Sequence, residues 1–196
     1  MPKGARTREV ILASGVALAC RVGLGGLTIG SLATEVGLSK SGMYAHFGSK
    51  EALQIAVLDA AGLEFSDAVL RPALAVERGE QRFRALVDRW LECGRLRRPG
   101  GCLFVKASTE LDDQPGPVRD RVRELHVELG RSIARIVVGG IEQGQLRADL
   151  DPAQLATDLY GVMLAYYHAA RLLDDPAAER RARAAVEALI SAARAG

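Results

Sequence analysis

The sequence predicts an all-α protein of about nine helices. Apolar residues recur at helical rather than alternating spacing in the long segments between its seven prolines. Asp151-Pro152 and Asp175-Pro176 are each typical of a helix N-cap followed by proline in the first turn. No Asn-Gly or Asp-Gly pair separates two alternating runs, so β-hairpins have no support.

The bounds of the expected helices follow from these prolines, caps and apolar spacings. They span residues 6–22, 29–36, 40–46, 50–71, 80–98, 103–110, 117–143, 152–173 and 177–194. Thr28, Ser39 and Ser49 are suitable N-caps for the second, third and fourth helices. The helix over 117–143 begins after Pro115-Gly116-Pro117, and the last two helices begin at the Asp-Pro pairs. The helix over 80–98 has an apolar stripe of Phe83, Leu86, Val87, Trp90 and Leu91.

Composition excludes a disordered chain and reveals an uneven charge. The 196 residues are 48% apolar, which is enough to build a sizeable core. The formal charge of +2 hides a division, because residues 1–50 hold six basic and two acidic residues and the remainder sums to −2. A basic N-terminal quarter on a slightly acidic body indicates that one end of the protein meets an anion.

Cysteine usage and hydropathy indicate the compartment. Cys20, Cys93 and Cys102 are odd in number and widely spaced, and no apolar leader follows Met1, so we expect reducing cytoplasm. Cys93 or Cys102 could act as a redox switch, although a buried inert thiol is the commoner case. Charges or glycines interrupt every run of about 18 apolar residues, so we expect no membrane helix.

Residues 28–47, TIGSLATEVGLSKSGMYAHF, predict two short helices that cross closely. Ala33 is small at the expected crossing, and Gly37 can adopt the left-handed conformation that ends the first helix. Ser39 then caps a second helix that turns Met43 and Phe47 inward and leaves Lys40, Ser41, Tyr44 and Ala45 outside. This arrangement predicts a helix-turn-helix.

The outer side of the second short helix suits a DNA groove. Its exposed start offers a basic residue, hydroxyls and free backbone amides, all of which favour an anion. Lys50 follows the Ser49 cap, so a cation and amides meet where a phosphate could bind. Each of these residues alone is more often a plain cap, a packing residue or a solvated charge. Their joint spacing inside the basic quarter favours DNA.

Residues 6–53 resemble the DNA-binding domain of the TetR family of bacterial transcriptional regulators. The family pattern is matched by Ile11-Leu12, Gly23, Thr28, Ala33-Gly37, Tyr44, Phe47, Lys50, Glu51 and Leu53. The resemblance implies a three-helix DNA-binding domain over 1–50 and an effector-binding and dimerisation domain over 51–196. It also implies a palindromic operator in double-stranded DNA.

Carried over by position, the resemblance implies that the DNA-binding residues are Thr28, Ser39, Lys40, Ser41, Gly42, Tyr44, His46 and Lys50. Thr28, Tyr44 and Lys50 would contact phosphates, and Lys40, Ser41 and Gly42 the groove. His46 is as readily a cap or packing residue as a contact. Gly42 and Ala45 leave few side chains on the recognition helix to distinguish bases, so the operator sequence does not follow from these residues.

For the body, the resemblance implies a small-molecule effector, for which we expect an apolar compound, and a homodimer. Candidate effector-binding residues are Trp90, Phe104, Glu110, His126, Met163, Tyr166 and Tyr167, with Tyr160, Cys93 and His168 as further possibilities, although such aromatics are more often core. The last two helices would supply the dimer surface, with Leu155, Leu159, Val162 and Tyr166 on one and Ala182, Val186, Leu189 and Ile190 on the other. Alternatively, these faces complete the monomer core.

Other functional classes have weaker support. His and Cys never occur at ligand spacing, so we expect no metal site, and we expect no cofactor. No nucleophile elbow, phosphate loop or dinucleotide fingerprint is present, so we expect no enzyme. The sequence therefore favours a ligand-responsive regulator, most simply a repressor. The alternatives are an activator or architectural DNA-binding protein with a protein partner, or a helical small-molecule carrier or enzyme.

Overall fold

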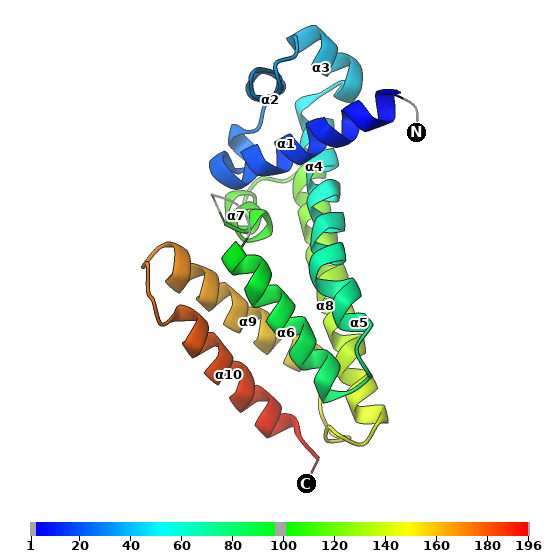
Figure 1. Cartoon of the computed structure of the whole chain (residues 1–196), viewed down its shortest axis with the longest axis vertical. Helices are drawn as coiled ribbons and strands as arrows, with labels where there is room; N and C mark the ends of the chain where they lie inside the picture. Colours follow the sequence, from blue (N-terminus) through cyan, green and yellow to red (C-terminus); the bar gives the residue numbers. More distant parts are fainter. Residues whose placement is uncertain (1–2, 97–100, 196) are drawn as a thin grey trace. The chain divides into compact units, whose positions relative to one another are not determined.

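The computed structural model describes residues 3–96 and 101–195, and it confirms an all-α protein. Within those ranges no strand forms apart from one isolated bridge between Leu146 and Arg194. The helices, shown in Figure 1, are α1 (Lys3–Gly26), α2 (Ile29–Val36), α3 (Lys40–Phe47), α4 (Lys50–Phe65), α5 (Arg71–Leu74), α6 (Glu80–Leu96), α7 (Leu103–Glu110), α8 (Pro117–Glu142), α9 (Pro152–Arg171) and α10 (Ala178–Ala193).

One helix differs from expectation in its interior. The span predicted as a single helix over 50–71 contains a π-helical segment, η1 (Ser66–Leu70), between α4 and α5. The N–H of Arg71 bonds to the carbonyl of Ser66, five residues earlier. Pro72 follows immediately and has no N–H with which to continue the helical hydrogen bonds. The wider π-helical turn therefore lies directly before a residue that cannot donate one.

The described chain divides into two compact units. The first comprises Met1–Glu64 with Arg98–Leu125, and the second comprises Phe65–Arg97 with His126–Gly196. These units are defined by contacts. The division at residue 50 into a DNA-binding and an effector-binding part is a division by function, and it stays a prediction.

The core of the first unit joins α1, α2, α3, α4 and α7. Leu24, Leu32, Met43 and Leu53 are completely buried in it. Gly15 permits a close approach of α1 to α4, because a Cβ at this position would lie 2.7 Å from Val57 Cγ2. Burial of these apolar surfaces fixes the two short helices α2 and α3 on the rest of the unit.

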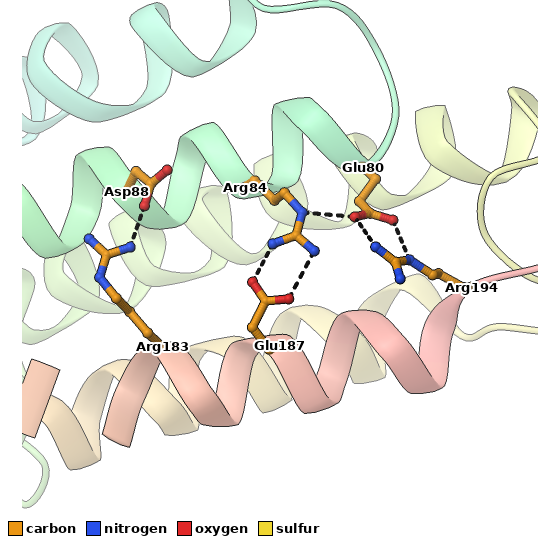
Figure 2. Close-up of polar contacts among 6 residues, drawn as sticks. All are labelled: Glu80, Arg84, Asp88, Arg183, Glu187 and Arg194. Carbon is orange, nitrogen blue, oxygen red and sulfur yellow. Dashed lines mark hydrogen bonds and ion pairs between the residues drawn. The ribbon is translucent and has the colours of Figure 1, made fainter. Parts of the chain in front are cut away.

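The second unit packs α9 and α10 side by side (Figure 1) and joins α6 to α10 through ion pairs (Figure 2). Arg84 bonds to Glu80 at 2.8 Å on its own helix and to both carboxylate oxygens of Glu187 on α10. Arg194 bonds to both oxygens of Glu80, each at 2.8 Å. Farther along the same two helices, Arg183 pairs with Asp88.

These contacts lower the pKa of Glu80. A hydrogen bond from Arg194 and another from Arg84 lower the pKa of its carboxyl from 4.5 to about 2, although burial acts in the opposite direction. The hydrogen bond that Arg84 donates to Glu187, followed by the one that it donates to Glu80, raises the pKa of Arg84. The cluster is therefore fully ionised at neutral pH and ties the start of α6 to α10.

One described helix, Thr7–Gly26 within α1, is long and apolar enough to cross a membrane by length and composition. The expectation of no such helix counted glycines as interruptions, but glycine adds no charge to the apolar run. A single helix of this kind is weak evidence for a membrane span, since a buried core helix can have the same length and composition. Here Ile11, Val16 and Leu24 are buried in the core of the first unit.

Candidate nucleic-acid interface

The start of α2 is fixed by a reciprocal cap. Thr28 Oγ1 accepts from the N–H of Ser31 at 3.0 Å, and Ser31 Oγ accepts from the N–H of Thr28 at 2.9 Å. Ser31 Oγ also donates to the carbonyl of Gly26 at 3.2 Å. The expected cap at Thr28 is thus present, with Ser31 completing a capping box.

The turn between the two helices depends on Gly37. Its backbone is left-handed, with φ 69° and ψ 29°, and the N–H of Leu38 bonds back to the carbonyl of Ala33 at 2.9 Å. Ala33 itself is buried to 2% exposure. The turn and the close crossing expected from Ala33 and Gly37 are therefore both observed.

Helix α3 buries one side and exposes the other. Ser39 Oγ accepts from the N–H of Gly42 at 3.1 Å, which caps the helix. Met43 and Phe47 face the core. The side chains left outside are those of Lys40, Ser41, Tyr44, Ala45 and His46.

Each expected groove residue lies on or beside this exposed side of α3. Tyr44 is 55% exposed, which is high for a tyrosine. A Cβ at Gly42 would lie 3.2 Å from Ser39 Oγ, so glycine at this position leaves room for the cap hydroxyl. The His46 ring lies 6.2 Å from that of Phe47 while the side chain remains exposed.

Charge on this face is basic. Helix α3 carries no carboxylate, and Glu35 of α2 is paired with Arg21 at 2.7 Å. Arg8 of α1 lies over the Phe47 ring, 5.5 Å from its centroid, and adds a cation beside the end of α3. Sequence reasoning missed Arg8, because a cation on α1 has no sequence spacing that relates it to Phe47.

Lys50 lies at the first position of α4. Ser49 Oγ accepts from the N–H of Ala52 at 3.1 Å, so the expected cap is present. Lys50 Nζ donates to the carbonyl of Gly25 at 3.2 Å. An ammonium has three donors, so this bond fixes its position and leaves donors for a phosphate.

The expected effector-binding residues are divided between the two units, and their role stays a prediction. Trp90, His126, Met163, Tyr166 and Tyr167 belong to the second unit. Phe104 and Glu110 belong to the first. The Glu110 carboxylate accepts the backbone N–H groups of Leu24, at 2.8 Å, and Gly25, and so is engaged with the end of α1.

An aromatic cluster forms in the second unit around Trp90. The Trp90 ring lies 5.5 Å from Phe65, edge to face, and 6.2 Å from Tyr160, whose ring lies 5.7 Å from His126. Trp90 is 3% exposed, and its Nε1 is buried without a hydrogen-bond partner in the described chain. Tyr166 and Tyr167 lie farther along α9, where both approach Gly94.

Metal ligation has no geometric support in the part of the chain that the structure describes. In residues 3–96 and 101–195, no three His, Cys, Asp or Glu side chains gather in a way that could hold a metal ion. The exposed basic helix-turn-helix thus remains the arrangement with the clearest chemical use.

Comparison with protein families gives two matches that together cover most of the chain. Residues 11–57 match the family described as bacterial regulatory proteins, tetR family. Residues 79–186 match the family described as tetracyclin repressor-like, C-terminal domain. The chain belongs to the TetR family. It is therefore a transcriptional regulator by family, as the helix-turn-helix pattern predicts.

Solved structures of TetR regulators share the fold. A TetR transcriptional regulator from Chloroflexus aurantiacus J-10-FL is 27% identical, with a TM-score of 0.87 over 100% of both chains. A TetR-family regulator from Cytophaga hutchinsonii is 21% identical, with a TM-score of 0.87 over 100% of this chain and 98% of that one. AibR, solved with isovaleryl coenzyme A and operator DNA, is 22% identical, with a TM-score of 0.65 over 81% of this chain and 84% of its own. No curated protein matches the chain.

Proposed function

We propose that this TetR regulator is a homodimeric repressor that binds a palindromic operator and is released by a small molecule. The observation that carries this is the capped, basic, carboxylate-free outer side of α3, with Tyr44 exposed. A short helix of this kind fits the major groove. AibR, which shares the fold, was solved with both a small molecule and operator DNA.

Residues 1–50 would contact the operator, and residues 51–196 would bind the effector and dimerise. Thr28, Tyr44 and Lys50 would bind phosphates, and Ser39, Lys40, Ser41, Gly42 and His46 would lie toward the base edges. Because Gly42 and Ala45 offer almost no side chain, few hydrogen bonds to bases are available. Phosphate contacts and DNA shape would then supply much of the affinity. A protein that binds a bacterial operator would act in the cytoplasm.

The effector would bind at the aromatic cluster of Phe65, Trp90, His126 and Tyr160. A buried N–H without a partner costs free energy, and the Nε1 of Trp90 is such a group. A ligand acceptor atom would remove this cost, while the surrounding rings favour an otherwise apolar molecule. We therefore propose an apolar effector that carries at least one hydrogen-bond acceptor.

The homodimer would form through the outer faces of α9 and α10. The apolar faces expected for the dimer include Leu155, Leu159, Val186 and Ile190. These four side chains are already buried in the single chain, so they belong to the core of the second unit. The outer faces instead expose small residues, which allow helices to approach closely: Gly161 and Ala165 on α9, and Ala184, Ala188 and Ala192 on α10. A Cβ at Gly161 would meet open space.

Selection of bound duplexes from a random DNA pool tests the proposed operator binding. The wild-type chain should enrich a palindrome with half-sites about one helical turn apart. Tyr44→Ala should bind the enriched duplex about tenfold less tightly. The matched control is Thr109→Ala, whose hydroxyl bonds only to carbonyls of its own helix and should change nothing.

A reporter placed behind the enriched duplex then separates the regulatory roles. A repressor should lower transcription of the reporter, and an activator should raise it. Enrichment of no sequence by the wild-type chain would exclude the operator function altogether. Enrichment without any effect on the reporter would indicate an architectural DNA-binding protein.

A further inference from the structure

Helix α1 is broken at Gly23, where φ is 78° and ψ is 173°. A break of this kind leaves carbonyls before it and N–H groups after it without their usual helical partners. Helix α7 supplies both kinds of partner from one face, since Lys106 and Glu110 are one turn apart.

The two side chains of α7 match the polarity of the break. Lys106 Nζ donates to the carbonyls of Cys20, at 2.7 Å, and Arg21, at 3.3 Å. The Glu110 carboxylate accepts the N–H of Leu24 at 2.8 Å and that of Gly25. A cation thus meets the carbonyl end of one helical segment, and an anion meets the amide end of the next.

The same two residues of the break bond to α4 through their carbonyls. Gln54 Nε2 donates to the carbonyl of Leu24, and Lys50 Nζ donates to that of Gly25 at 3.2 Å. Gln54 is only 7% exposed, so its bond lies within the core. Leu24 and Gly25 therefore connect α7 on one side to the start of α4 on the other.

Glycine is required at two positions for this connection. A Cβ at Gly23 would lie 2.8 Å from Glu110 Oε2, and a Cβ at Gly25 would lie 2.5 Å from Glu110 Oε1. Gly26, the next residue, accepts a hydrogen bond from Ser31 of the α2 cap. The segment Gly23–Gly26 thus contacts Lys50 directly and Thr28 through Ser31, and both are candidate phosphate-binding residues.

We propose that Glu110 and Lys106 are positioning residues for operator binding. Through the segment Gly23–Gly26 they hold Lys50 Nζ and the start of α2 in the geometry that meets the DNA backbone, and displacement of α7 releases both. A carboxylate that only stabilised the break in α1 would act independently of Lys50. This inference rests on the operator-binding function proposed above, in particular on a phosphate contact by Lys50.

A double-mutant cycle separates positioning from simple stabilisation. The variants are Glu110→Gln, Lys50→Gln and their combination, and the probe is the duplex enriched by the wild-type chain. Each single variant should bind that duplex about tenfold less tightly, and the double variant should be no weaker than the weaker single one. Each should also lower the slope of log K against log salt by about 0.9 for every phosphate that the variant no longer neutralises. A reduced fraction of folded protein would leave that slope unchanged.

Gly25→Ala provides a variant that keeps every charge. Its methyl group would displace the Glu110 carboxylate, so it should reproduce the affinity and salt slope of Glu110→Gln. Thr109→Ala on the same helix is the matched control and should behave as wild type. If the substitutions prevent folding, amide exchange in the wild-type protein gives the answer, because operator binding should slow exchange at Leu24 and Gly25.

The possible outcomes are distinct. Additive losses for Glu110→Gln and Lys50→Gln, or exchange at Leu24 and Gly25 that operator leaves unchanged, would overturn the positioning role while leaving operator binding intact. A wild-type chain that binds no duplex would overturn both this inference and the proposed function.

Discussion

Lys50 and Glu110 bond to opposite sides of one residue, Gly25. The ammonium of Lys50 donates to the Gly25 carbonyl at 3.2 Å, while the Glu110 carboxylate receives the Gly25 N–H. Two side chains 60 positions apart in the sequence are thereby joined through a single glycine. This connection links a helix outside the helix-turn-helix to Lys50, for which we propose a phosphate contact.

The turn between α2 and α3 should be sensitive to a single methyl group. Gly37→Ala should destabilise the protein by about 1 kcal/mol, because φ at this position is 69° although no neighbouring atom obstructs a Cβ. Gly130→Ala in α8 is the control, since its Cβ also meets open space within a helix. It should stabilise by roughly 0.5–1 kcal/mol. Urea unfolding measures both, and equal signs would contradict this account of Gly37.

The ion pairs of Glu80 should appear in the acid stability of the protein. Because its pKa is lowered from 4.5 to about 2 in the folded chain, Glu80 stabilises the protein above pH 4.5 and loses this contribution as the pH falls through 2. Glu80→Gln should cost about 1–2 kcal/mol at pH 7, a value reduced by the exposure of Arg194.

Melting temperatures between pH 7 and pH 2 measure this effect. The difference between wild type and Glu80→Gln should shrink as the pH falls. Glu142→Gln is a suitable control, because Glu142 meets Arg78 only at 3.6 Å in an exposed pair. A difference for Glu80→Gln that stays constant down to pH 2 would show that its carboxylate is not held ionised by Arg194 and Arg84.

Trp90 offers both a probe and a test of the effector site. It is the only tryptophan in the chain, so fluorescence excited at its absorption edge reports the aromatic cluster alone. Apolar compounds that change this emission and release the operator should carry a hydrogen-bond acceptor. Trp90→Phe, which removes the N–H, should weaken their releasing effect about fivefold to tenfold, measured by anisotropy of labelled DNA. Unchanged potency in Trp90→Phe would place the effector elsewhere.

The outer face of α10 should decide the oligomeric state. Ala188 is exposed in the single chain, so Ala188→Glu should leave the fold of each subunit intact. In a dimer formed through this face, two buried carboxylates would oppose each other, and the subunits should separate. Light scattering measures the mass, with Arg131→Glu at an exposed position of α8 as the control, which should leave the mass unchanged. A dimer that survives Ala188→Glu would exclude this interface.

Local signals predicted the helix-turn-helix well. Thr28, Ser39 and Gly37 act on residues within one turn of themselves, so their caps and turn could be inferred from spacing alone. Asp151 caps α9 with Pro152 in its first turn, as predicted. The same prediction for Asp175 was wrong: its carboxylate accepts the N–H of Ala177, and α10 begins only at Ala178, because Asp175 and Pro176 lie in the turn before the helix. The π-helical segment before Pro72 was missed, since a proline near a helix end is equally compatible with a simple stop.

Long-range partners could not be predicted in this way. Glu110 is a candidate effector-binding residue by sequence, and that role stays a prediction. Its bond to Leu24, 86 residues earlier, could not be inferred, because nothing in its own neighbourhood specifies that contact. The glycines at 23, 25 and 26 were visible, but the reason for those at 23 and 25 lies in the carboxylate that approaches them. Similarly, the apolar faces that contain Leu155 and Val186 predict burial, but they do not tell whether the same chain or a second subunit covers them.

Chemical footprinting of major-groove guanines tests the central claim most directly. Dimethyl sulfate methylates guanine N7, which lies in the groove that α3 would enter. With the wild-type chain bound to its enriched duplex, protection should fall in two patches about 10 base pairs apart, or a multiple of that spacing, on one side of the DNA. Tyr44→Ala should remove both patches together at the same protein concentration. Protection confined to minor-groove positions, or a single patch without a symmetric partner, would contradict a dimer that reads DNA through α3.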